Sequence, residues 1–185
     1  MTPPSPGCTA IVDGLVRAPY DWCTNAPSKQ FRSSMIDALN IWTCARLRPL
    51  ETIKDIDSKL QNASLLLDDI GDRSPLRRGR PAAHTVYGVA ETINSANLAI
   101  LEATSQIQSL HSQSSVVFYE RMRQIYIGQS DDLRWTRHRS CPLLDEYVQM
   151  IDGKTGGLLQ LHILTPDFEP RRSHHTHRPS ITDPR

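Results

Sequence analysis

Residues 65–84, which read LLLDDIGDRSPLRRGRPAAH, place three carboxylates and two adjacent guanidinium groups behind an apolar run. These charged residues are Asp68, Asp69, Asp72, Arg77 and Arg78. If the apolar run is helical, the three carboxylates lie at neighbouring positions on one helix face, where they repel one another unless a cation binds. Mg²⁺ suits such a site because it takes oxygen ligands and bridges to phosphates, and guanidinium groups pair with phosphate oxygens. The stretch therefore predicts a diphosphate site with Mg²⁺ held by the three carboxylates.

An acidic cluster at a helix end is more often a solvated surface than a metal site. The residues around this cluster favour the metal site. The stretch LLLDDIGDRSPLRRG resembles the first aspartate-rich region of trans-isoprenyl diphosphate synthases, in particular the fungal geranylgeranyl diphosphate synthases. In that family an apolar helix ends in DDIxDxSxLRRGxPxAH, and every fixed position is filled here. The resemblance implies a helical-bundle fold and Mg²⁺ as cofactor. It implies catalytic roles for Asp68, Asp69, Asp72, Arg77 and Lys154.

Two basic residues nearer the N-terminus extend the resemblance. Lys29 and Arg32 lie three apart in the first turn of a predicted helix, where their charge opposes the helix macrodipole and suggests an anionic partner. They match the family's P-G-K-x-x-R, with Ser28 in place of the glycine, which implies that both bind the diphosphate of isopentenyl diphosphate. Gln61 stands where the family usually has a histidine that contacts this substrate. Its amide can donate a hydrogen bond but carries no charge.

Two later motifs resemble the part of the family's site that faces the allylic substrate. Residues 128–135, GQSDDLRW, resemble G-Q-x-x-D-L-x-W, in which the glutamine (Gln129 here) and the aspartate face the cavity. Residues 146–158, EYVQMIDGKTGGL, resemble E-E-Y-x-x-M-x-x-x-K-T-G-G-L. The resemblance implies that Lys154 and Thr155 bind near the allylic diphosphate, together with Arg77, and that the lysine stabilises the departing pyrophosphate.

Two small residues, Ala63 and Ser64, precede Asp68 by five and four positions, about one helical turn. In the family the growing prenyl tail runs along this wall, and bulky aromatic side chains there stop elongation early. Small residues imply room for a C20 product. The alternative is that Ala63 and Ser64 only permit close packing of helices.

The composition excludes several classes of protein. The chain has 185 residues with 21 basic and 20 acidic side chains, a net charge of +1, which predicts neither a nucleic-acid nor a membrane-surface partner. No stretch approaches the roughly 18 apolar residues of a transmembrane helix. The four cysteines are scattered and show no metal-ligand spacing, which indicates reduced thiols in an intracellular, cytoplasmic protein.

Apolar periodicity predicts an all-α fold. Helices are expected over residues 11–25 (a short pair around Pro19), 27–42, 49–69, 84–110, 116–134 and 143–159. The proline-rich residues 1–10 and 162–185 are expected to be disordered, so that residues 11–161 form the domain. The resemblance stops after about Leu161, before the family's second aspartate-rich motif, F-Q-x-x-D-D. We therefore expect a partial isoprenoid-synthase helical bundle, truncated before that motif.

The resemblance implies a prenyltransferase of isoprenoid and diterpenoid biosynthesis. It would condense an allylic diphosphate, with farnesyl diphosphate expected, with isopentenyl diphosphate held by Lys29, Arg32 and Arg78, giving geranylgeranyl diphosphate. Residues 92–97 resemble a stretch at the family's dimer interface, which implies a homodimer. Without the second motif we expect impaired catalysis. The alternative is a non-catalytic fragment that pairs with a full-length synthase; a terpene cyclase is weaker, because SPLRRGRP and the KxxR pair belong to chain-elongating enzymes.

Overall fold

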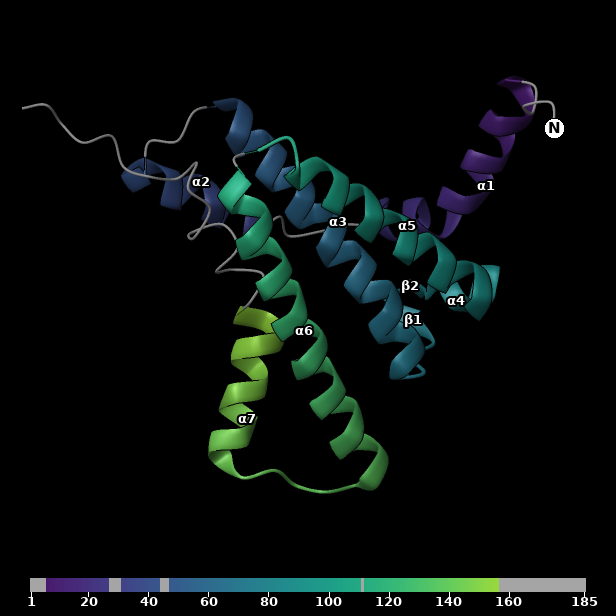
Figure 1. The fold of residues 1–185 in the computed structure, drawn as a ribbon. Coiled ribbons are helices and arrows are strands. Elements are labelled where there is room, and N and C mark those ends of the chain that lie inside the picture. Colours follow the sequence, from purple (N-terminus) through teal and green to yellow (C-terminus); the bar gives the residue numbers. More distant parts are fainter. Residues whose placement is uncertain (1–5, 27–30, 44–46, 111, 157–185) are drawn as a thin grey trace, which may run out of the picture.

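The computed structural model describes residues 6–26, 31–43, 47–110 and 112–156, which fold into packed helices and one short β-ribbon (Figure 1). The elements are α1 (Pro6–Thr24), α2 (Phe31–Thr43), α3 (Leu47–Gly71), β1 (Leu76–Arg77), β2 (Arg80–Pro81), α4 (Ala83–Tyr87), α5 (Val89–Ile107), α6 (Ser112–His138), α7 (Leu144–Ile151) and the π-helical turn η1 (Asp152–Gly156). The predicted all-α bundle is confirmed. No helix in the described ranges is long and apolar enough to cross a bilayer.

Helices α3 and α5 lie side by side and antiparallel at the centre of the fold (Figure 1). Small residues of α5 allow this close approach: Ala96 and Ala99 share a buried cluster with Ala63 of α3, and Ala103 belongs to a second cluster with Leu60. The second cluster also contains larger side chains, Ile56 of α3, Ile107 of α5 and Phe118 of α6. A smaller cluster of Ile36, Leu50 and Ile53 attaches α2 to the first turns of α3.

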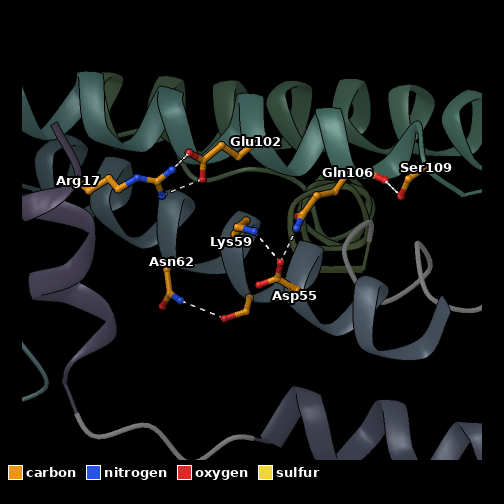
Figure 2. Close-up of polar contacts among 8 residues, drawn as sticks. Arg17, Asp55, Lys59, Asn62, Glu102, Gln106 and Ser109 are labelled. Atoms are coloured by element: carbon orange, nitrogen blue, oxygen red, sulfur yellow. Dashed lines mark hydrogen bonds and ion pairs between the residues drawn. The ribbon is translucent and has the colours of Figure 1, made fainter. Parts of the chain in front are cut away.

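Polar contacts hold the same helices in register, as Figure 2 shows. Asp55 of α3 accepts hydrogen bonds from Lys59 Nζ at 2.6 Å and from Gln106 Nε2 of α5 at 2.5 Å. Arg17 of α1 forms an ion pair with Glu102 of α5. The hydrogen bond of Gln106 thus joins α5 to α3, and the ion pair of Arg17 joins α1 to α5.

The expected pair of helices around Pro19 is wrong. Helix α1 runs without interruption from Pro6 to Thr24 and contains Pro19, so it begins inside the segment that we expected to be disordered. A proline inside a helix removes one backbone donor and clashes with the preceding turn. Packing compensates here: Pro19 is fully buried, and the backbone N–H of Tyr20 donates to Ser95 Oγ of α5 at 3.2 Å.

The expected single helix over residues 84–110 is also wrong. It is broken at Gly88, which has φ 88° and separates α4 from α5. This backbone conformation is open to glycine and strained for other residues, so the break follows from a glycine in an otherwise helical pattern. The expected helix over 143–159 is regular only to Ile151, and the chain then forms η1.

Candidate active site

A cavity of about 330 Å³ lies between α3, α5, α6 and η1, with Arg32 of α2 at its edge. Its polar lining contains seven residues that the sequence singled out: Arg32, Gln61, Ser64, Asp68, Gln129, Lys154 and Thr155. They come from positions up to 123 residues apart (155 minus 32), yet they line one space. Lys29 lies outside the described residues.

The remaining lining is apolar and was not predicted from the sequence. It consists of Leu60, Leu67, Ile100, Met122, Ile125, Tyr126 and Leu133, together with Gly71. Along α3 the lining extends from Asp68 through Ser64 to Leu60, and eight residues of helix span about 12 Å. A charged mouth above an apolar body suits a ligand with an anionic head and a hydrocarbon tail.

Lys154, which lines the cavity, lies between the carboxylates of Asp68 and Asp132. Its Nζ donates to Asp132 Oδ2 at 2.7 Å and lies 3.9 Å from Asp68 Oδ1. Burial alone would lower the pKa of Lys154, but the hydrogen bond to Asp132 and the attraction of Asp68 outweigh it, so the pKa is raised and the side chain stays charged. Asp132 matches the aspartate of G-Q-x-x-D-L-x-W, and only the structure shows that it anchors the lysine.

Two glycines set how close this lysine comes to the aspartates. A Cβ on Gly128 of α6 would lie 2.8 Å from the backbone N of Lys154 and 2.9 Å from the backbone O of Met150. A Cβ on Gly153 would lie 3.2 Å from the backbone O of Gln124. Helix α6 and η1 thus meet backbone to backbone, which brings Lys154 within reach of Asp132 and Asp68.

The three aspartates do not share one face as we expected. Adjacent helix positions differ by about 100°, and Asp69 points away from the cavity into the space between α3 and the β-ribbon. There its side chain is 2% exposed and forms an ion pair with Arg77. This pair raises the pKa of Arg77 and neutralises a carboxylate that would otherwise be buried with its charge uncompensated.

Asp68 and Asp72, one turn apart, are the carboxylates whose chemistry fits Mg²⁺. Burial raises the pKa of Asp68; Lys154 opposes this shift, and Asp72 adds to it. Asp68 is partly buried and Asp72 is exposed, and two such neighbouring hard oxygen donors repel each other less when a cation binds between them. Asp69 does not fit this role, because Arg77 occupies its carboxylate. Within the described residues, no three or more His, Cys, Asp or Glu side chains are grouped to hold a metal ion.

The second arginine, Arg78, lies at the tip of the β-ribbon and is exposed. Arg78 has φ 53° and Gly79 has φ 77°, the two positive values of a tight two-residue hairpin, in which Arg77 pairs with Arg80. Such a conformation is strained for a residue other than glycine. Arg78 Nη1 lies 3.5 Å from the backbone O of Ala26, just after α1.

At the edge of the cavity, Arg32 is held by a buried carboxylate that was not predicted from the sequence. Arg32 Nη1 lies 3.5 Å from Asp57 Oδ1, and the Asp57 side chain is 5% exposed. One turn further along α3, Gln61 Oε1 is buried without a hydrogen-bond partner. Gln61 also lines the cavity, where its amide N–H groups can donate to an anionic ligand, whereas the unpaired oxygen would need a donor.

The two residues expected to form the chain-length wall are separated by the structure. Ser64 lines the cavity, and its hydroxyl donates to the backbone O of Gln61 at 2.9 Å. Ala63 has no exposed surface and packs in the core against α5. The cavity interpretation therefore applies to Ser64 and the helix-packing alternative applies to Ala63.

Comparison with known proteins matches the chain to one family of enzymes and to several fungal terpene synthases. The sequence profile described as polyprenyl synthetase matches residues 13–166. The chain is 49% identical over 150 residues to an ophiobolin F synthase of Emericella variicolor, which covers 80% of this chain and 21% of the relative. It is 45% identical over 154 residues to a bifunctional sesterterpene synthase of Aspergillus aculeatus (83% and 22%) and 45% identical over 148 residues to a bifunctional type I diterpene synthase of Aspergillus flavipes (80% and 19%). The chain thus spans about a fifth of the length of these relatives.

Proposed function

The chain belongs to the polyprenyl synthetase family, and from this premise we propose that it is a prenyltransferase that joins an allylic diphosphate to isopentenyl diphosphate. The observation that carries the proposal is the cavity, in which Asp68, Lys154 and Arg32 line the polar part and apolar residues of α3, α5 and α6 line the rest. The polar part suits two diphosphates and the apolar part suits a prenyl tail.

In this reaction the allylic carbon–oxygen bond breaks and the departing diphosphate takes the electron pair. Lys154, kept charged by Asp132, lies where it can stabilise that developing negative charge. The double bond of isopentenyl diphosphate then forms a bond to the allylic carbon, and the released pyrophosphate takes the proton that is lost. Arg32, positioned by Asp57, and the side-chain NH2 of Gln61, which can donate to an anion, would hold isopentenyl diphosphate, with Lys29 and Arg78 as further ligands.

Mg²⁺ is proposed as the cofactor, held by Asp68 and Asp72. When bound, it would supply positive charge to the diphosphate leaving group. Asp69 and Arg77 would act indirectly, because their ion pair fixes the end of α3 to the β-ribbon and so orients its neighbour Asp68.

The first test is a turnover assay on the purified chain with farnesyl diphosphate, labelled isopentenyl diphosphate and Mg²⁺. We expect Asp132→Asn to reduce turnover by about tenfold or more, because Lys154 loses its anchor. The matched control is Asp131→Asn, which removes the neighbouring carboxylate and only its ion pair with Arg134 on the helix surface. Equal turnover by both variants would refute the role given to Lys154 and Asp132.

For the product we propose geranylgeranyl diphosphate, made from farnesyl diphosphate, because Ser64 leaves the apolar part of the cavity open. The names of the relatives include both diterpene and sesterterpene synthases, so chain length needs its own measurement. We expect Ser64→Phe to shorten the products by blocking the cavity. Ala63→Phe, one residue away in the core, should instead lower the melting temperature. Unchanged products from Ser64→Phe would show that the tail does not pass this wall.

A non-catalytic role in a complex with a full-length synthase remains the second candidate. Its supporting observation is that large apolar side chains of α5 are exposed, with Val89 at 48%, Ile93 at 37% and Leu101 at 64%. Exposed apolar side chains along one helix can mark a protein interface. This candidate predicts co-purification with a full-length homologue and no turnover without it, whereas turnover by the isolated chain contradicts it.

A further inference from the structure

The end of α1 holds the β-ribbon that carries the arginines through contacts that the proposed reaction does not use. Trp22 Nε1 donates to the backbone O of Pro81 at 2.9 Å, and the guanidinium carbon of Arg80 lies 4.2 Å from the centre of the Trp22 ring. The ring also meets Tyr87 of α4 edge to face, with centroids 6.1 Å apart. One side chain of α1 therefore contacts both residues of β2 and the helix that follows.

These contacts act on a strained turn. Arg78 and Gly79 connect β1 to β2 with positive φ angles of 53° and 77°. For Arg78 this conformation is sterically unfavourable, because its Cβ lies close to the following carbonyl oxygen. A ribbon of two residues per strand has too few hydrogen bonds to maintain such a turn by itself. Strained conformations persist only where the surrounding structure determines them, and here Trp22 supplies that support from one side.

We infer that Trp22 is a positioning residue that fixes the Arg77–Arg80 ribbon, and with it the guanidinium of Arg78, for binding the diphosphate of isopentenyl diphosphate. The inference rests on the proposed function, because it takes Arg78 as a ligand of that diphosphate. Trp22 acts through Arg80 and Pro81 and touches no substrate. Its contribution is preorganisation: less conformational freedom of the turn is lost when the anion binds.

The test is calorimetric titration of the full chain with isopentenyl diphosphate, without added Mg²⁺ so that the carboxylate site is not loaded. We expect Trp22→Leu to weaken binding by about tenfold and Trp22→Phe by about threefold, because phenylalanine keeps an aromatic face for Arg80 but loses the hydrogen bond to Pro81. The matched control is Trp135→Leu, which removes a partly buried tryptophan of α6 that lies outside the main cavity. Its affinity should equal that of the wild type.

Arg80→Lys keeps the charge of Arg80 but loses the flat group that stacks on Trp22, so it separates positioning from electrostatics. If Trp22 acts through Arg80, adding Arg80→Lys to Trp22→Leu weakens binding less than Arg80→Lys does in the wild type. If the fold-losses in affinity of the two single variants multiply in the double variant, Trp22 does not act through Arg80. Trp22→Phe and Arg80→Lys keep the tryptophan site filled by a ring, so they test the proposal even if Trp22→Leu does not fold.

Arg78→Gln distinguishes this inference from the function on which it rests. If Arg78→Gln binds isopentenyl diphosphate as tightly as the wild type, or if the wild type does not bind it, Arg78 is not a ligand of this diphosphate. The inference about Trp22 is then wrong as well. If Arg78→Gln binds more weakly while a folded Trp22→Leu binds normally, the ligand role stands and the positioning role of Trp22 alone is overturned.

Discussion

Replacing Gly128 with alanine tests how the cavity is assembled. The new methyl group would lie 2.8 Å and 2.9 Å from backbone atoms of Lys154 and Met150, closer than real Cβ atoms come to any neighbour. Both neighbours are backbone, so they can move aside only if α7, which contains Met150, or η1, which contains Lys154, shifts. Overpacking usually costs about 1–3 kcal/mol, and two backbone clashes place Gly128→Ala at the upper end, about 3 kcal/mol.

The higher helix propensity of alanine stabilises the Gly128→Ala variant and so opposes the destabilising clash. A control variant is needed to separate the two effects. Alanine is favoured over glycine inside a helix by about 1 kcal/mol. Gly14→Ala, in α1, has the same intrinsic gain but its Cβ meets nothing within 4 Å. The difference in free energy of unfolding between the two variants therefore isolates the clash. Gly153→Ala, with a contact at 3.2 Å, should fall between them.

The measurement is denaturant unfolding of the three variants beside the wild type. We expect Gly128→Ala to be about 3 kcal/mol less stable than Gly14→Ala, which for a chain of this size corresponds to a melting temperature roughly 6–12 °C lower. Binding of a diphosphate should weaken as well, because Lys154 moves with η1. Equal stability of Gly128→Ala and Gly14→Ala would refute the close approach of α6 to η1.

Two further predictions concern the aspartates. Burial raises the pKa of Asp68, so its carboxyl group binds a proton more tightly in the folded state than in the unfolded state. Above its folded pKa the group is ionised, and this ionised form destabilises the fold. Asp68→Asn should therefore raise the melting temperature near pH 7 while removing Mg²⁺-dependent binding. The increase in melting temperature should become smaller as the pH falls through the folded pKa of Asp68. A lower melting temperature of the variant at pH 7 would contradict this prediction. For the buried pair, Arg77→Met should cost about 3–5 kcal/mol and more than Asp69→Asn, since it leaves a carboxylate of 2% exposure unpaired whereas Arg77 can reach solvent. Urea unfolding of both variants decides, and the reverse order would show that Arg77 is not the main compensation for Asp69.

Short-range patterns predicted most of the helices correctly. The apolar spacing in α2, α3 and α6 reflects a local rule, because residues three or four apart share a helix face wherever the helix packs. The errors occurred where a single residue competes with that rule. Pro19 suggested a break that burial and Ser95 prevent, and Gly88 produced a break that the surrounding pattern concealed.

The family, the all-α fold and the residue types of the site can be predicted from the sequence alone, because motifs such as DDIGDRSPLRRG and KTGG are contiguous in the chain. Which of these side chains lie together depends on how the helices pack in three dimensions. This packing turns Asp69 toward Arg77, separates Ser64 from Ala63, and brings Asp132 to Lys154 across 22 residues. These pairings depend on the packing of distant helices, which for Lys154 includes the contact at Gly128, and no local pattern in the sequence encodes that distance.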